Sequence, residues 1–439
     1  MKLLMICLLA CLLSISGNAQ GFRLVSGKSK VVIPFELVNN LIVVPINVNG
    51  IELKFLVDSG IEETILFSLD DTEEISFANV EKIKLQGLGG NEYIEALKSF
   101  DNIMIVGGLT DIKHEIYIVL NQDFNISEYV GIPINGIIGF KFFRNNLVEL
   151  DYDRKRITVY KDDKKFRKKL EKQYKSLPIS LELQKPYVKL LVYNDEVAVS
   201  SKLLVDTGNS DALWLFSEKP DAVKLPAKCL EDFLGRGFSG EIHGKRGRVK
   251  KLDLSDFEFT NPIASFPDAA SIKNIKMVDK RMGSLGGEIL RRFTLVFDYK
   301  NRVLYLKKGA SFNEPFHYNM SGLEVHHDGL QWVTETVGLK TSLSSATYDV
   351  NGKKQDDFQY KFELEPIYRV SHVRPGSPAD LVGILKDDVI VSINGLKAFR
   401  YTLQEISSLM KSEDGKTIEL EIERDGKLLQ VQFQLKSLL

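Results

Sequence analysis

Residues 55–60 read Phe-Leu-Val-Asp-Ser-Gly, and residues 203–208 read Leu-Leu-Val-Asp-Thr-Gly. Each stretch is an apolar run that ends in an aspartate, a hydroxyl residue and a glycine. Apolar residues occupy alternate positions from residue 51 to residue 57, which is the period of a β-strand. Either triplet alone is typical of a turn, because aspartate bonds its own backbone and glycine accepts positive φ. The occurrence of the motif twice is therefore the informative observation.

Further landmarks follow each motif in the same order and at nearly the same spacing. They are the Gly-rich segments 87–90 and 237–240, the glycines Gly139 and Gly286, and the Asp-Tyr pairs 151–152 and 298–299. A repeat of this kind indicates a duplicated structural unit. We therefore predict two related lobes, each built mainly from β-strands.

The first residues of the chain have the pattern of a signal peptide. Lys2 precedes an apolar run at residues 3–13, and small and polar residues then lead to Ala19. We predict a signal peptide over residues 1–19, cleaved near Ala19, and export of the chain to the periplasm or beyond. A lipoprotein anchor at Cys11 is the weaker alternative, because apolar residues continue beyond it. No later run is long enough to predict a transmembrane segment.

The length of 439 residues suggests about three domains. Lys and Arg number 58 and Asp and Glu 59, and this balance argues against nucleic acid as the main partner. The basic stretch between the repeats is expected to be a solvated linker helix rather than a nucleic-acid or membrane patch. The predicted boundaries are an N-terminal lobe at 20–160, the linker at 161–176, a C-terminal lobe at 177–312, and a last domain at 313–439 with an inserted loop at about 340–362.

The repeated motifs resemble those of the aspartic proteases related to pepsin and to the retroviral enzymes. The resemblance covers roughly residues 35–306 and includes the downstream motifs Ile137-Ile138-Gly139 and Ser284-Leu285-Gly286. It implies a mainly β, bilobed acid-protease fold in which Asp58 and Asp206 meet at a pseudo-twofold axis.

The resemblance also implies the chemistry. Two carboxylates about 3 Å apart cannot both ionise, so Asp58 and Asp206 would share one proton and activate a water against a peptide carbonyl. This reaction needs no cofactor and no metal. The residues that the resemblance assigns to support of the catalytic loops are Ser59, Gly60, Thr207, Gly208, Gly139 and Gly286.

The residues that follow the two triplets depart from the family pattern in a way that affects the pH of action. Pepsin-like enzymes commonly carry a hydroxyl residue after the triplet that bonds the aspartate, whereas this chain has Ile61 and Asn209. An ionised Asp58 thus lacks one stabilising donor, and we predict activity at less acidic pH than that of pepsin. Ser284 replaces an apolar residue of the family motif, which we interpret as a mild departure.

The Gly-rich segments are candidate flaps that fold over a substrate, and plain surface hairpins are the alternative. The string Gly-x-Gly-x-x-Gly at residues 235–240 also matches a dinucleotide-binding fingerprint, but no βαβ unit surrounds it, so nucleotide binding is not predicted. The candidate flap residues are Gly89, Gly90, Tyr93, Gly237 and Gly240.

Cysteine and histidine supply no convincing second site. Cys229 with His243 could form a nucleophile and its base, but a free thiol in a loop is the simpler interpretation. His326 and His327 are adjacent, and on a strand such side chains point to opposite faces. We therefore predict no metal site.

The C-terminal part resembles a PDZ domain of the bacterial type, which implies an α+β fold. The resemblance rests on residues 370–379, Val-Ser-His-Val-Arg-Pro-Gly-Ser-Pro-Ala, and on residues 383–395. Asp387 replaces the usual glycine, and aspartate tolerates the left-handed turn conformation. Thr402 and Glu405 form a capping box that predicts a helix start.

A PDZ domain binds a peptide C-terminus as an added strand and holds its carboxylate with backbone N–H groups. A purely structural PDZ domain is the alternative. The candidate carboxylate loop is Ser321, Gly322, Leu323 and Glu324.

We predict an exported aspartic endopeptidase that acts on polypeptide in a cleft between its lobes. A non-catalytic peptide-binding protein with the same cleft and groove is the alternative. A third hypothesis is a processing or signalling protease of narrow specificity, in which the PDZ domain gates access.

Overall fold

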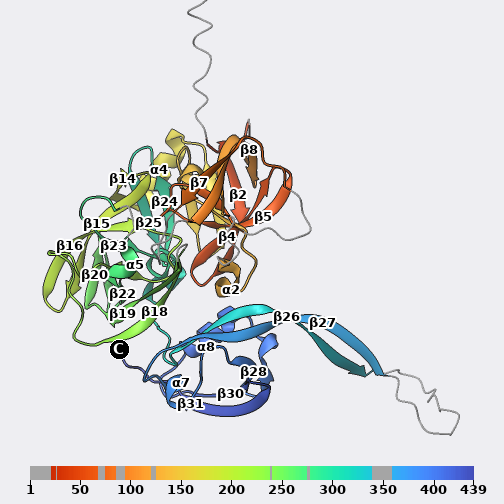
Figure 1. Cartoon of the computed structure of the whole chain (residues 1–439). Coiled ribbons are helices and arrows are strands. Elements are labelled where there is room, and N and C mark those ends of the chain that lie inside the picture. The colour runs from red at the N-terminus through yellow and green to blue at the C-terminus, as the bar shows by residue number, and fades with distance from the viewer. Residues whose placement is uncertain are drawn as a thin grey trace, which may run out of the picture.

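The protein is mainly β, with two β lobes side by side and a smaller domain beneath them (Figure 1). The computed structural model describes residues 21–25, 27–67, 75–85, 94–119, 125–237, 240–273, 277–338 and 358–439. The predicted signal peptide with Cys11 and Ala19, and the candidate flap residues Gly89, Gly90 and Tyr93, lie outside the described residues. Most of the predicted loop at 340–362 also lies outside them.

The N-terminal lobe is built on one sheet with the strand order β1-β9-β6-β10-β5-β4-β8-β7, and β3 pairs with β4. The elements of this lobe are β1 (Arg23–Leu24), β3 (Glu36–Val38), β4 (Leu41–Val48), β5 (Ile51–Val57), β6 (Thr64–Leu66), β7 (Val80–Leu85), β8 (Ile94–Val106), β9 (Leu109–Val119), α2 (Ile126–Val130), β10 (Gly136–Ile138) and α3 (Phe140–Phe143).

The C-terminal lobe repeats this plan with the strand order β18-β19-β22-β17-β23-β16-β15-β20-β21, and β14 pairs with β15. Its elements are β14 (Ser180–Glu182), β15 (Lys185–Asn194), β16 (Val197–Val205), β17 (Leu213–Leu215), β18 (Cys229–Gly237), β19 (Gly240–Arg248), β20 (Lys251–Leu254), β21 (Phe257–Thr260), β22 (Ile263–Pro267), α5 (Ala269–Ile272), β23 (Arg281–Leu285) and α6 (Gly287–Leu290).

The duplicated unit appears in the strand pairing. In the N-terminal lobe β10 lies parallel to β5 and antiparallel to β6. In the C-terminal lobe β23 lies parallel to β16 and antiparallel to β17. Each Asp-containing loop therefore joins two strands that flank the strand before the downstream glycine.

A third sheet joins the lobes, because its strand order β13-β25-β24-β11-β12-β2 takes strands from both repeats. At its centre β11 and β24 are antiparallel neighbours. The helix α4 begins after the capping carboxylate of Asp163 and packs Phe166 and Leu170 into a small apolar cluster. The elements are β2 (Lys30–Pro34), β11 (Leu147–Asp151), β12 (Arg156–Tyr160), α4 (Lys164–Gln173), β13 (Lys175–Pro178), β24 (Phe293–Asp298) and β25 (Val303–Lys308).

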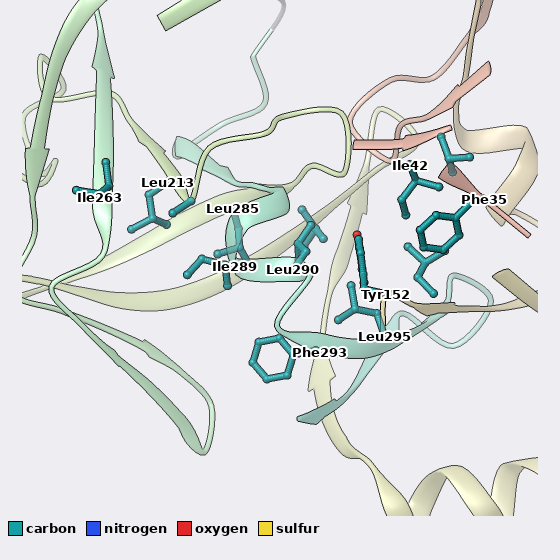
Figure 2. Close-up of a cluster of buried hydrophobic side chains, with 14 of the residues drawn as sticks. Phe35, Ile42, Tyr152, Leu213, Ile263, Leu285, Ile289, Leu290, Phe293 and Leu295 are labelled. Atoms are coloured by element: carbon teal, nitrogen blue, oxygen red, sulfur yellow. The ribbon is translucent and has the colours of Figure 1, made fainter. Parts of the chain in front are cut away.

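The apolar core is continuous across this junction (Figure 2). Phe35 and Ile42 come from the N-terminal lobe, Leu285 and Ile289 come from the C-terminal lobe, and Leu295 lies on the shared sheet. Burial of such side chains contributes about 1.5–3 kcal/mol each. The two Asp loops are thus held on one continuous packed body.

The C-terminal domain has the strand order β26-β27-β28-β30-β31, with β29 paired to β28. The predicted capping box is present, and α8 buries three apolar residues on one face. Asp387 has a φ of 73°, as its place in a left-handed turn requires. The elements are η1 (Ala310–Asn313), β26 (Leu323–Gly338), β27 (Phe358–Val373), α7 (Pro378–Leu381), β28 (Val389–Ile393), β29 (Leu396–Lys397), η2 (Ala398–Arg400), α8 (Leu403–Met410), β30 (Thr417–Arg424) and β31 (Lys427–Gln434).

Strands β26 and β27 extend as a two-stranded ribbon away from the domain (Figure 1). Residues 358–362, which we expected in the inserted loop, belong to β27. These residues pair with residues 334–338 of β26, so the polar composition of the insert was a poor guide to where the loop ends.

Candidate active site

The two aspartates stand directly after the central strands of their lobes, β5 and β16. The backbone N–H of Asp58 donates to the carbonyl of Ile138 at 3.0 Å, and that of Asp206 donates to Leu285 at 3.0 Å. The strand carrying each downstream glycine therefore fixes the start of each Asp loop in the same way. Equivalent backbone atoms of the two repeats therefore make equivalent hydrogen bonds.

Reciprocal hydrogen bonds join the loops across the lobes. The Ser59 N–H donates to Thr207 Oγ1 at 2.9 Å, and the Thr207 N–H donates to Ser59 Oγ at 3.1 Å. Each hydroxyl then donates to the opposite lobe, Ser59 to the Val205 carbonyl at 2.7 Å and Thr207 to the Val57 carbonyl at 2.8 Å. All of these groups are buried, so the four bonds lock the two loops in one relative position.

The glycines allow the carboxylates to approach. A Cβ atom on Gly60 would lie 2.7 Å from Asp206 Oδ1, and one on Gly208 would lie 2.3 Å from Asp58 Cγ. Each carboxylate therefore rests on the glycine of the opposite loop. The Gly60 N–H also donates to Asp58 Oδ1 at 2.6 Å. No other residue type fits at these two positions without moving the dyad.

Burial and mutual repulsion dominate the electrostatics of the pair. Burial, followed by the charge of Asp206, raises the pKa of Asp58 to about 8, and the Gly60 N–H and Lys185 oppose this rise. Burial also raises the pKa of Asp206, against the lowering effects of Arg281, Lys185, the Gly208 N–H and Ser284. A hydrogen bond between the two carboxyl groups contributes to the raised pKa of Asp58. Burial and mutual repulsion together favour a single proton shared by the two carboxyl groups.

Gly139 and Gly286 lie beneath the loops, where close backbone contacts exclude a side chain. A Cβ atom on Gly139 would lie 2.5 Å from the carbonyl oxygen of Ile61, and one on Gly286 would lie 2.3 Å from that of Asp211. The following N–H of Phe140 donates to the Ile61 carbonyl at 3.1 Å. A role of the two glycines in supporting the catalytic loops stays a prediction.

Among the described contacts, the side chain of neither residue that follows the triplets bonds the carboxyl group of Asp58 or Asp206, although the Asn209 N–H donates to the main-chain carbonyl of Asp206 at 3.4 Å. Asn209 Oδ1 accepts from the Asp211 N–H at 2.9 Å, and Ile61 contributes its backbone carbonyl to the contact with Gly139 and Phe140. The missing donor that motivated our prediction of a less acidic pH range is therefore missing in the structure too.

Sequence reasoning missed two residues near the dyad and underrated a third. Lys185 acts electrostatically on both aspartates, while Arg281 and Ser284 act on Asp206. Arg281 is 7% exposed and lies within a strand, and a charged residue at a core position was the signal that could have found it. Ser284 is more than a mild departure, because its hydroxyl lowers the pKa of Asp206.

The candidate flap of the C-terminal lobe is a hairpin. Gly237 and Gly240 are paired at the ends of β18 and β19. These antiparallel strands contradict a βαβ unit, so the Gly-x-Gly-x-x-Gly string is a coincidence of turn residues. A role as a flap stays a prediction.

The other sequence candidates have local structural partners. His326 stacks on Tyr129 with ring centroids 5.7 Å apart, and His243 bonds Glu241 at 3.1 Å. Cys229 begins β18, opposite Gly247. Within the described part of the chain, no group of three His, Cys, Asp or Glu residues is arranged to hold a metal ion.

The candidate carboxylate loop of the C-terminal domain uses its own donors. The N–H groups of Ser321 and Gly322 both donate to Asn319 Oδ1 at 3.1 Å, and that of Leu323 donates to Ser321 Oγ at 3.0 Å. The Asn319 amide also donates to Glu324 at 3.0 Å. A peptide carboxylate at this loop would have to replace these acceptors.

The C-terminal domain contacts both lobes, and its contact with the C-terminal lobe is made through polar groups. Arg374 donates to Asp232 at 3.2 Å, and Arg246 donates to the other oxygen of Asp232 at 2.7 Å. On the N-terminal lobe, α2 lies beside β26 (Figure 1), and a Cβ atom on Gly131 would lie 2.7 Å from Leu403, the first residue of α8. The helix α2 therefore reaches both elements between which PDZ domains bind peptides.

Fold and site together define a bilobed β protein with a paired-aspartate site and a separate C-terminal α+β domain. Residues 369–424 match the PDZ domain family. The chain matches none of the curated proteins with which it was compared. It is similar to the aspartic proteinase from Irpex lacteus, with 12% identity over 65% of this chain and 99% of that one and a TM-score of 0.41, values too low to assign a role to any residue here. No helix in the described part is long and apolar enough to cross a membrane.

Proposed function

We propose that the protein is an aspartic endopeptidase that hydrolyses peptide bonds with a water activated by Asp58 and Asp206. The observation that carries this proposal is the pair of loops locked by Ser59 and Thr207, which press each carboxylate against the glycine of the opposite loop. A structural role alone does not account for a buried and a partly buried acidic side chain placed against each other, because their repulsion and desolvation cost free energy.

The chemistry follows from the shared proton. The ionised carboxylate accepts a proton from a water held between the pair, while the protonated one donates a hydrogen bond to the peptide carbonyl. As water attacks, the carbonyl oxygen takes the proton of the protonated carboxyl, and a tetrahedral diol forms. As the C–N bond breaks, the nitrogen takes the proton that water gave to the other carboxylate, and a diol hydroxyl returns its proton to the first carboxylate. Both carboxyl groups then return to a single shared proton. The substrate is polypeptide in an extended conformation.

We further propose that the chain acts after export and that its PDZ domain binds a peptide C-terminus beside β26. The contacts of α2 with β26 and α8 favour the gating hypothesis over simple recruitment, since a peptide entering there competes with the N-terminal lobe. Peptide binding at this place would then be coupled to the position of that lobe.

Single substitutions Asp58→Asn and Asp206→Asn test the catalytic proposal. Asparagine preserves shape but cannot exchange a proton, so each variant should lose at least about 10³-fold in kcat/KM on a peptide library, given the usual contribution of acid–base catalysis. Asp195→Asn is the matched control, because Asp195 lies exposed in a hairpin at a φ of 51° that asparagine also accepts. Turnover that survives both dyad substitutions would defeat the proposal, and binding without turnover in the wild type would favour the non-catalytic alternative.

A further inference from the structure

The pseudo-twofold symmetry of the site is broken at two buried positions. Strand β10 pairs Ile137 with Leu56, and β23 pairs Ser284 with Leu204, so Ile137 and Ser284 are equivalent. Arg281 pairs with Lys202 beyond a register shift in β23, so its place corresponds to that of Asn135, whose N–H donates to the Lys54 carbonyl in the N-terminal lobe. At these two positions the N-terminal lobe thus has an isoleucine and a neutral amide, where the C-terminal lobe has a hydroxyl and a guanidinium.

Arg281 and Ser284 form a chain of donors that ends at one aspartate. Arg281 Nη2 donates to Ser284 Oγ at 3.0 Å, and its Nε donates to the Gly283 carbonyl at 3.2 Å. The serine oxygen accepts from a cation, so its own hydrogen is free to donate, and interaction with the Ser284 hydroxyl lowers the pKa of Asp206. The guanidinium also lies 5.4 Å from the centroid of the Phe216 ring.

None of the other charged or titratable groups described near the dyad adds a charge that favours one aspartate over the other. Lys185 on β15 lowers the pKa of both aspartates. Tyr187, also on β15, interacts with Asp206 and Arg281, and Tyr299 interacts with Asp58. Burial is the first cause of the raised pKa of each of these two phenols, so both stay neutral in the working range.

We propose that Arg281 and Ser284 are positioning residues that hold the negative charge of the dyad on Asp206, so that the shared proton resides on Asp58. A buried cation needs a compensating anion, and a charge-assisted chain through one hydroxyl supplies it without a direct ion pair. The catalytic roles that this assigns to the two aspartates rest on the proposed function. Asp206 would then accept the proton of water, and Asp58 would donate to the peptide carbonyl.

Titration of the single remaining carboxyl tests the assignment without any need for turnover. In the Asp58→Asn protein, ¹³C-detected titration should give Asp206 a pKa at least about one unit below that of Asp58 in the Asp206→Asn protein, because only Asp206 has the cationic chain. Adding Arg281→Met to Asp58→Asn should raise the pKa of Asp206 by about one unit. Equal values, or a lower pKa for Asp58, would overturn the inference even if the protein cleaves peptides.

A second set of variants uses activity and includes a conservative rescue. Arg281→Met should move both limbs of the kcat/KM profile to higher pH by about one unit, and Ser284→Ala should move them in the same direction by less. Arg281→Lys should restore the original profile, because it keeps the charge. Ser201→Ala is the control, since Ser201 is a buried serine that bonds its own strand. If Arg281→Met loses activity without a shift in the pH profile of kcat/KM, Arg281 has a merely structural role. If Arg281→Met fails to fold, an unchanged pH profile in Ser284→Ala would contradict the inference instead.

Discussion

At the scale of single residues, the site depends on where two hydroxyl groups point. Ser59 and Thr207 are 0% and 1% exposed, and each uses its donor and its acceptor across the lobe boundary. A buried N–H or carbonyl that loses such a partner costs free energy, because no water can replace it. These residues therefore connect stability to the geometry of the dyad.

Thr207→Val should separate this role from side-chain volume. Valine has nearly the same shape but leaves the Ser59 N–H and the Val57 carbonyl without partners, so the free energy of unfolding should fall by about 2–4 kcal/mol. We also expect a lower kcat/KM, since the two loops lose two of their four cross-links. Urea unfolding and peptide cleavage measure both effects.

Thr207→Ser is the matched control, because it keeps the hydroxyl and should retain most of the stability. A Thr207→Val protein that is as stable and as active as the wild type would show that the cross-links do not hold the site.

At the scale of elements, the duplicated Asp loops could be predicted from the sequence, because a repeated motif at the end of an apolar run carries both its strand and its turn. The PDZ helix could be predicted for a similar local reason, through the Thr402–Glu405 capping box. The sheet that joins the lobes could not, since the pairing of β11 with β24 depends on the packing of two distant segments. Arg281 could not be predicted, because the sequence shows a charged residue but does not show that the pairing of β23 with β16 brings it near Asp206.

At the scale of the whole molecule, buried charges connect the PDZ domain to the Asp206 loop. Asp232 lies between Arg374 of the PDZ domain and Arg246, and Arg246 donates to Asp211 at 3.0 Å. The Asp211 N–H in turn donates to Asn209, which follows the Asp-Thr-Gly triplet of this lobe. Such a network couples the two parts if either end is displaced.

Arg374→Met should reveal this coupling. Asp232 would lose one of its two buried partners, so the C-terminal lobe should be destabilised by about 1–3 kcal/mol. The fluorescence of Trp214, which is 9% exposed and lies in that lobe, reports its unfolding in urea once the exposed Trp332 is replaced by phenylalanine.

Lys386→Met serves as the control, since it removes an exposed cation from the same domain. An unchanged urea midpoint for the Trp214 signal in Arg374→Met would show that the PDZ domain and the lobe are energetically independent.

The central claim is that the carboxyl groups of residues 58 and 206 share one proton and use it for hydrolysis. The pH dependence of kcat/KM for the wild-type protein tests it most directly. The pKa of Asp58 is raised to about 8, so the dyad loses its shared proton and kcat/KM should fall as pH rises through this value. At low pH the second carboxyl also gains a proton, and kcat/KM should fall again. We therefore predict a bell-shaped profile with its maximum well above pH 2. A maximum near pH 2, or a rate that keeps rising above pH 8, would contradict the account.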